Sequence, residues 1–228
     1  MRSQPEPLFK QQLWQADTLP VAGVDEVGVG AWAGPVIAAA VVLPRELSLI
    51  GLNDSKLLSA KRRAALFYAI RQCALAIGVG RVEVAEIDRL NIYWAAMLAR
   101  QRAVEALPLT PVHVVVDGKR RIMGLNLPQT PIVEGDRLHP SISAASIIAK
   151  VTRDRLMVEL GALYPGYGFE QHKGYGTPAH LAALMQLGPL PVHRHSYRPV
   201  ITAEHRQREF FPMQTTDRNT GRQYSPRK

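Results

Sequence analysis

Cysteine is almost absent from this chain of 228 residues, since Cys73 is the only one. A single cysteine excludes an internal disulfide and fits a reducing compartment. Long hydrophobic runs are lacking as well. The longest, Val36 to Leu43, ends at Pro44 and falls well short of the roughly 20 residues that a membrane-spanning helix needs. The N-terminal stretch also lacks the apolar centre of a signal peptide, so we expect a cytoplasmic protein.

Acidic residues are scarce relative to basic ones. The chain has 19 Asp and Glu against 28 Lys and Arg, which gives a formal net charge of +9. A soluble surface can carry such an excess without a specific purpose. The sharper interpretation is a polyanionic partner, because a basic surface neutralises phosphates well. Hydrophobic residues make up 46% of the chain, enough to bury the core of one large domain, with or without an appendage.

The order of hydrophobic patterns along the chain predicts an α/β fold. Apolar runs at 21–26 and 36–43, joined through Gly34-Pro35, predict an antiparallel hairpin. Further strands are expected at 77–84, 112–117 and 132–136, and helices at 60–76, at 85–107, from 142 onward and from 178 onward, with Ser59 and Thr177 as N-caps. Strands and helices in this order predict a mixed sheet flanked by helices, with a small helical C-terminal part.

The ends of the chain differ in composition from its middle. Residues 1–19 form a polar lead-in, and 20–203 carry the patterns of a folded domain, with the C-terminal helical part at about 160–203. Residues 204–228 are basic and have almost no apolar pattern, so we expect a disordered tail.

Four carboxylates are expected at the ends of three strands. Asp25 and Glu26 end the first strand, Asp117 ends the strand at 112–117, and Asp136 ends the strand at 132–136. Functional sites in open α/β sheets gather at the carboxyl ends of strands. Ligand sets made only of oxygen select Mg²⁺ or Mn²⁺ rather than zinc.

An acidic centre in a basic chain suits nucleases and phosphoryl-transfer enzymes. The alternative is that the acidic pair is a solvated turn and that the other two carboxylates merely cap turns. The residues alone leave both interpretations open. His193 and His195 form an H-x-H pattern, but no cysteine or acidic residue lies close to them in the sequence, so we do not expect zinc there.

Six stretches of the chain, in order, resemble ribonuclease HII and together span about residues 20–200. They are 21–44 (VAGVDEVGVGAWAGPVIAAAVVLP), 53–59 (NDSKLLS), 86–104 (EIDRLNIYWAAMLARQRAV), 114–120 (VVVDGKR), 133–155 (VEGDRLHPSISAASIIAKVTRDR) and 164–196 (YPGYGFEQHKGYGTPAHLAALMQLGPLPVHRHS). Six ordered motifs are highly specific, whereas a single acidic pair would not be.

The resemblance implies a ribonuclease H-like mixed sheet and an endoribonuclease that uses metal ions. Such an enzyme hydrolyses the RNA strand of RNA–DNA hybrids and incises 5′ of ribonucleotides embedded in duplex DNA, leaving 5′-phosphate and 3′-hydroxyl ends. The motif match assigns catalysis and the binding of Mg²⁺ or Mn²⁺ to Asp25, Glu26, Asp117 and Asp136. The implied partner is nucleic acid rather than a membrane, and we expect a monomer.

The resemblance also implies a set of substrate-binding residues. The set comprises Gly28, Val29, Gly30, Lys56 and Tyr175. Their positions add Lys150 and Arg153, on the helix after Asp136, and Lys173, beside Tyr175, as expected phosphate contacts. Val29 is a departure, because the family usually carries Gly-Arg-Gly at this turn, and the change removes a phosphate contact. Tyr175 matches the family tyrosine that recognises the RNA–DNA junction. The alternatives are a loop aromatic at Tyr175 and solvated basic side chains at Lys56, Lys150 and Arg153.

Two other functions stay open at this point. One is a resolvase- or integrase-like DNA nuclease on the same fold, which the six motifs argue against. The other is a catalytically weak nucleic-acid-binding protein, which Val29 suggests and the intact carboxylate set argues against.

Overall fold

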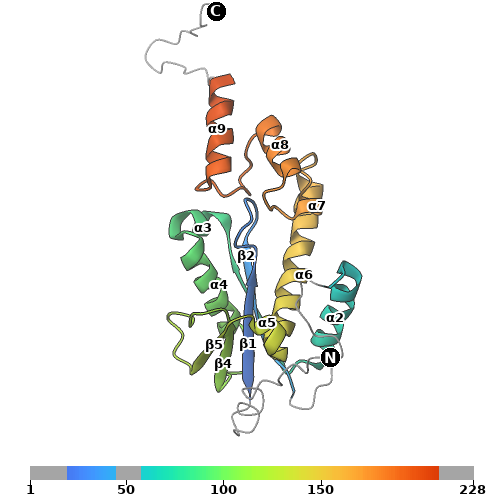
Figure 1. Ribbon diagram of the computed structural model, residues 1–228, viewed down its shortest axis with the longest axis vertical. Coiled ribbons are helices and arrows are strands. Elements are labelled where there is room, and N and C mark those ends of the chain that lie inside the picture. Colours follow the sequence, from blue (N-terminus) through green and yellow to red (C-terminus); the bar gives the residue numbers. More distant parts are fainter. Residues whose placement is uncertain (1–19, 45–57, 211–228) are drawn as a thin grey trace, which may run out of the picture.

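A mixed five-stranded sheet lies between two layers of helices in the computed structural model, which describes residues 20–44 and 58–210 (Figure 1). The strand order is β3-β2-β1-β4-β5. β1 pairs antiparallel with β2, which pairs antiparallel with β3, whereas β1–β4 and β4–β5 are parallel. The strands are β1 (Val21–Val27), β2 (Val36–Val42), β3 (Ala76–Val82), β4 (His113–Asp117) and β5 (Gln129–Ile132). The predicted α/β class and mixed sheet are confirmed.

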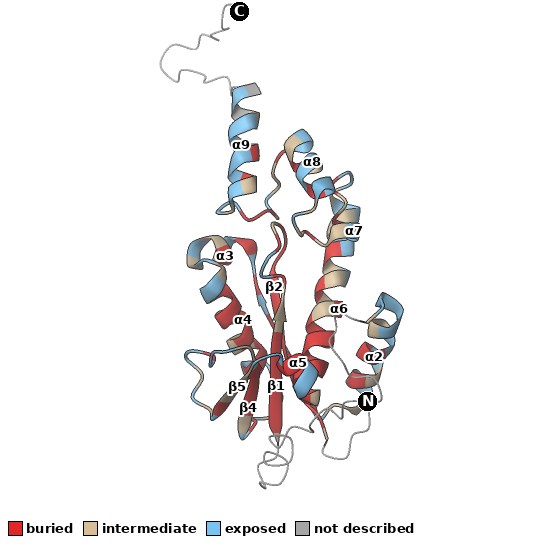
Figure 2. Ribbon diagram, in the orientation of Figure 1, coloured by how far each residue is buried: buried red, intermediate tan, exposed pale blue. Residues whose placement is uncertain are grey.

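Helices cover both faces of this sheet. The helices of the described residues are α2 (Ala60–Cys73), α3 (Val84–Leu90), α4 (Ile92–Glu105), α5 (Gly135–Leu138), α6 (Pro140–Leu163), α7 (Phe169–His172), α8 (Pro178–Leu187) and α9 (Arg198–Phe210). α4 packs on one face, and α6 with α2 packs on the other. Figure 2 shows the buried residues along β1, β2 and the sheet-facing sides of α4 and α6, while α9 is mostly exposed. Of the described helices, none combines the length and the apolar character that crossing a membrane requires.

Small residues let the helices approach the sheet closely. A Cβ atom added at Gly80 of β3 would lie 2.0 Å from the carbonyl oxygen of Ala99 in α4. On the opposite face, a Cβ at Gly23 of β1 would lie 2.3 Å from the backbone nitrogen of Ile142 in α6. Such distances are far below van der Waals contact, so glycine is required at both positions. Helix α4 therefore packs directly on the backbone of β3, and α6 on that of β1, two residues before Asp25.

Two predictions of secondary structure are wrong in more than their exact bounds. The helix expected at 85–107 is two helices, α3 and α4, because Asn91 adopts a φ of 69° and its side chain caps the start of α4. Asn favours such a left-handed position and an N-cap position. Asp136 is not at the end of a strand, since β5 ends at Ile132 and Asp136 lies in the short helix α5.

The C-terminal part is more ordered than its composition suggests. α9 continues to Phe210, so the disorder predicted from residue 204 is wrong for 204–210. Val200 and Ala203 of α9 are buried against Leu184 of α8, which supplies the apolar contact that anchors the helix. The predicted lead-in at 1–19 and the remainder of the tail lie outside the described residues. The Ser59 and Thr177 caps are confirmed, because each hydroxyl accepts a backbone N–H three residues later.

Candidate functional site

Three elements bring acidic side chains to one edge of the sheet. In the parallel pair β1–β4, Val24 lies opposite Val116, so Asp25 and Asp117 follow at neighbouring strand ends. The backbone N–H of Gly135 donates to Asp117 Oδ1 at 2.8 Å. This bond ties the start of α5, and with it Asp136, to the end of β4. Asp25 and Asp136 are each only 8% exposed.

The carboxylates are crowded enough to resist ionisation together. Burial, together with the charges of Glu26 and Asp117, raises the pKa of Asp25 to about 8, against hydrogen bonds from Ser146 and the Glu26 backbone. A buried group of like charges needs a cation or a proton. An all-oxygen donor set of this kind fits a hard divalent ion such as Mg²⁺ or Mn²⁺.

Arg100 of α4 already supplies one positive charge to this group. Its Nε and Nη2 both donate to Oε2 of Glu26 at 2.5 Å. The two side chains are only 10% and 15% exposed. Within residues 20–44 and 58–210, no three acidic, histidine or cysteine side chains lie close enough to enclose an ion.

The glycine-rich turn that follows β1 rests on a buried arginine. Arg194 donates to the carbonyl oxygens of Gly28 at 2.6 Å, Val29 at 2.9 Å and Gly34 at 3.0 Å. Gly28 has a φ of 92°, and a Cβ there would lie 2.3 Å from Nε of Arg153. Both the backbone angle and the space beneath the turn thus demand glycine at position 28.

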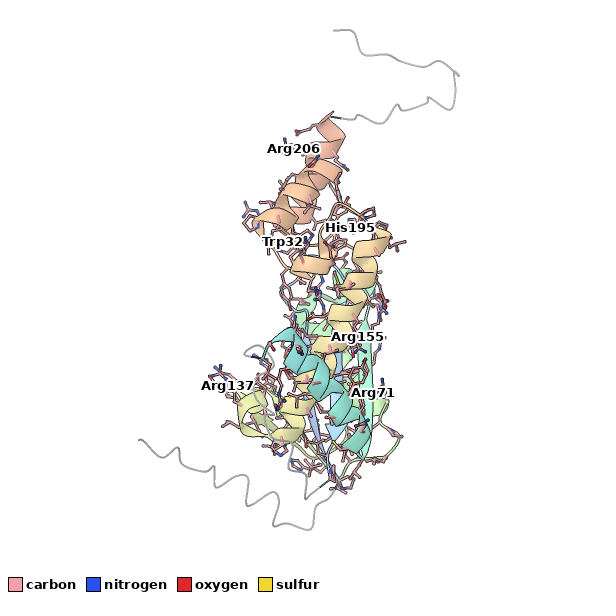
Figure 3. All side chains as sticks on the ribbon, turned by 90° about the vertical axis from the view of Figure 1, so that its right-hand side faces the viewer. Trp32, Arg71, Arg137, Arg155, His195 and Arg206 are labelled. Atoms are coloured by element: carbon pink, nitrogen blue, oxygen red, sulfur yellow. The ribbon has the colours of Figure 1, made fainter. Side chains whose placement is uncertain are left out.

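The loop that carries Tyr175 is joined to this turn by backbone pairing. Trp32 N–H donates to the Gly174 carbonyl at 2.8 Å, and Ala31 forms an antiparallel bridge with Tyr175. Figure 3 shows Trp32 high in the molecule near the C-terminal helices, far from Arg137 of α5. The half-buried ring of Tyr175 packs on the guanidinium of Arg153, 5.3 Å from its centroid. Tyr175 therefore lies beside the glycine turn.

Comparison with known proteins agrees with this geometry. The sequence model described as Ribonuclease HII matches residues 22–200. The chain belongs to the ribonuclease HII family. It is 52% identical over 193 residues to a ribonuclease HII of Myxococcus xanthus and 53% identical over 192 residues to one of Anaeromyxobacter, each alignment covering 84% of this chain. The chain spans only 66% and 61% of the lengths of these two relatives.

A solved structure supports the same fold. The crystal structure of ribonuclease H2 from Pyrococcus horikoshii superposes with a TM-score of 0.73 at 27% identity, covering 84% of this chain and 100% of that one. The predicted ribonuclease HII family and ribonuclease H-like fold are therefore confirmed.

The basic residues predicted to bind substrate in this ribonuclease HII chain differ in burial and in their partners. Arg153 is fully buried and donates to the carbonyls of Ala33, Pro35 and Lys173 at 2.9 to 3.0 Å. A buried guanidinium engaged in this way has no access to phosphate, so the predicted phosphate contact of Arg153 is wrong. Lys150 pairs with Asp154 at 2.8 Å.

Two further lysines complete the comparison with the prediction. The ammonium of Lys173 donates to the Glu170 carbonyl, and Lys173 adopts a positive φ of 53° beside Gly174. Lys173 is therefore partly engaged in holding its own loop. Lys56 lies outside the described residues.

Sequence reasoning missed Arg100, Arg194 and a chain of imidazoles. His180 and His193 are fully buried, with their Nε2 atoms 3.1 Å apart, and His172 stacks on His180 at 4.3 Å. Burial lowers the pKa of His180 to about 4 and that of His193 to about 3. Both are neutral, and the sequence signal was the density of histidine around the K-G-Y-G motif.

Sequence reasoning also missed a hollow beside the acidic group. A hollow of about 430 Å³ is lined by Glu26 and Asp117 together with Val29, Tyr93 and Arg120, among others. The guanidinium of Arg120 lies over the Tyr93 ring, and both side chains are exposed. The acidic group therefore opens onto a surface that is aromatic and basic.

Proposed function

We propose that this chain is a metal-dependent endoribonuclease that hydrolyses the RNA strand of RNA–DNA hybrids and incises 5′ of ribonucleotides embedded in duplex DNA. The observation that carries the proposal is the direct continuation of β1 from Asp25 and Glu26 into a glycine turn that lies beside Tyr175. Membership of the ribonuclease HII family supports the same substrate class. The products are ends with 5′-phosphate and 3′-hydroxyl groups.

Asp25, Glu26, Asp117 and Asp136 would hold Mg²⁺ or Mn²⁺. Bound divalent ions supply charge stabilisation and an activated water for phosphodiester hydrolysis. Asp25 and Asp136 are buried, whereas Glu26 and Asp117 line the hollow through which the substrate would reach them. The basic and aromatic wall around Tyr93 and Arg120 provides positive charge and stacking surface for a nucleic-acid strand next to the carboxylates.

The glycine turn would read the ribose through its backbone. Gly30 is exposed, and a Cβ added there meets nothing within 4 Å, so no neighbour in the described structure requires glycine at this position. Close approach of a substrate strand is a physical reason for its absence of a side chain. Gly28 and Val29 present their backbone from the same turn, and Tyr175 would stack at the RNA–DNA junction. The C-terminal part at about 160–203, which supplies Tyr175 and Arg194, would complete the substrate-binding surface.

A single assay tests this function against the alternatives. Purified protein is incubated with three duplexes of equal length, namely plain DNA, DNA with one ribonucleotide, and an RNA–DNA hybrid, each with Mg²⁺, with Mn²⁺ and with EDTA. We expect metal-dependent incision 5′ of the ribonucleotide and cleavage of the hybrid, with plain DNA left intact. Cleavage of plain DNA at a similar rate would indicate a DNA nuclease instead. Tight binding without cleavage of any duplex would indicate a binding protein.

A further inference from the structure

Arg100 makes an unusual contact with the acidic group. Both donating nitrogens of its guanidinium, Nε and Nη2, reach the same oxygen of Glu26, Oε2, at 2.5 Å. An arginine fork facing a carboxylate commonly places one donor on each oxygen. Here one oxygen takes both donors, and no hydrogen bond to Oε1 is found among the described residues. Glu26 is left with one engaged oxygen and one available oxygen.

The charge of Arg100 also acts on the whole acidic group. Arginine stays protonated in proteins, and the guanidinium of Arg100 contacts Glu26 in a hollow that Asp117 also lines. The guanidinium is therefore a permanent cation next to these carboxylates. Any divalent ion that enters the same group meets this fixed positive charge, which repels it and competes for Glu26.

We propose that Arg100 is a positioning residue that restricts Glu26 to coordination through one oxygen, lowers the affinity of the site for divalent cations, and disfavours Ca²⁺ relative to Mn²⁺ and Mg²⁺. Ca²⁺ accepts carboxylates through both oxygens and prefers six to eight ligands, whereas Mg²⁺ requires near-octahedral geometry with fewer protein ligands. Blocking Oε2 of Glu26 therefore removes a two-oxygen ligand that only the larger ion uses well. The inference rests on the proposed metal site.

Arg100 lines the hollow beside the carboxylates without facing solvent. Glu26, Asp117 and Arg100 all line this hollow. The side chain of Arg100 is only 10% exposed and contacts Glu26. Its charge is thus directed at metal binding and not at the nucleic-acid backbone.

Calorimetric titration of the metal-free protein with MnCl₂ and with CaCl₂ tests the inference without any cleavage assay. Arg100→Met removes the charge and both donors. Arg100→Lys keeps the charge but cannot place two fixed donors on Oε2. Arg102→Met is the matched control, because Arg102 lies two residues away on α4 and pairs with Glu86 outside the site at 2.8 Å.

We expect Arg100→Met to bind Mn²⁺ roughly tenfold more tightly than the wild type and to gain more for Ca²⁺ than for Mn²⁺. Arg100→Lys should keep the wild-type Mn²⁺ affinity within about threefold and still gain for Ca²⁺ relative to Mn²⁺. Arg102→Met should leave both affinities unchanged. Thermal unfolding in EDTA reports whether each variant folds, so that only folded variants are compared.

Two results overturn the inference, and they differ from failure of the metal site itself. If the wild type binds Mn²⁺ but Arg100→Met binds it equally or less tightly, Arg100 does not oppose the ion. An unchanged ratio of Ca²⁺ to Mn²⁺ affinity in both Arg100 variants rules out control of Glu26 coordination. If the wild type binds neither ion, the proposed metal site is wrong and this inference falls with it.

Discussion

The acidic edge of the sheet and the support beneath the glycine turn both bury polar groups, but they satisfy them in opposite ways. At the support, Arg153 and Arg194 direct their donors at backbone carbonyls, and the neutral imidazoles bond to each other and to the backbone. At the acidic edge, like charges face one another, and the pKa of Asp25 rises to about 8. The support is complete within the chain, whereas the acidic edge needs a proton or a cation in addition to Arg100. A support with all its polar groups paired therefore lies next to an acidic group with unbalanced charge.

The largest expected effect comes from removing one charge at the acidic edge. Asp117→Asn keeps an oxygen that can accept the Gly135 N–H but loses a negative charge beside Asp25. Cleavage of a duplex with one ribonucleotide should fall by roughly a thousandfold or more, because loss of a metal ligand removes nucleophile activation and charge stabilisation together. Substrate binding, measured by fluorescence anisotropy, should persist.

The same variant should not lose stability. Relief of repulsion should hold or raise the free energy of unfolding of the metal-free protein, measured by urea denaturation in EDTA. A strongly destabilised Asp117→Asn protein would contradict the proposed repulsion at the acidic edge. Cleavage by this variant at a near wild-type rate in Mg²⁺ would contradict the catalytic role of Asp117.

At the support, in contrast, removal of a charged side chain should lower the stability of the protein. Arg153→Met leaves the carbonyls of Ala33, Pro35 and Lys173 without their buried donor. We expect a loss of about 3 kcal/mol in the free energy of unfolding, as for other broken buried charge networks. Arg155→Met is the control, because Arg155 lies on the exposed side of the same helix and should cost less than about 1 kcal/mol. Equal losses in the two variants would show that burial of Arg153 is not what stabilises the loops.

The two regions are also expected to differ in the pH dependence of their contribution to stability. The pKa values of His180 and His193 fall to about 4 and about 3 from an ordinary 6.5, so the unfolded chain binds more protons than the folded one below pH 6.5. Their contribution to stability is therefore full above pH 6.5 and is lost as pH falls, by about 2 kcal/mol per imidazole between pH 7.5 and 5. The raised pKa of Asp25 acts in the opposite direction, since its protonated form is favoured in the folded state up to about pH 8.

The substitution Asp25→Asn separates the contribution of Asp25 to the pH dependence of stability from that of the two histidines. In Asp25→Asn the acidic contribution is removed, so the free energy of unfolding should rise more steeply from pH 5 to pH 7.5 than in the metal-free wild type. Urea denaturation at four pH values in EDTA measures both slopes. Parallel curves for the two proteins would mean that Asp25 does not titrate differently on folding.

The sequence predicted what depends on local pattern and failed where partners lie far apart in the chain. Asp25, Glu26 and Asp117 were placed correctly at strand ends, because apolar runs define where strands stop. Asp136 was assigned to a strand because the apolar pair before it resembles a strand end, while the turn into α5 depends on a tertiary bond from Gly135 to Asp117.

The two buried arginines show the same limit more sharply. Arg153 was predicted to contact phosphate or to be solvated on the surface of the helix after Asp136, and both predictions place it at the surface. Its carbonyl partners at 33 and 35 lie about 120 residues earlier in the sequence, and Arg100 meets Glu26 across 74 residues. Contacts between residues so far apart cannot be predicted from local sequence patterns. The density of glycine at 28, 30 and 34 did predict a turn, but not what fills the space beneath it.

The antiparallel bridges from Ala31 to Tyr175 and from Ala33 to His193 have a consequence for modularity. The turn after β1 is shaped by residues that the ribosome adds more than 140 positions later. We therefore expect that the N-terminal sheet and the C-terminal helices cannot be exchanged independently between relatives without loss of this turn. A chimera joined between α6 and α7 would have to carry matching residues at 28–35 to keep its turn, and a nascent chain acquires that turn only after Arg194 has emerged.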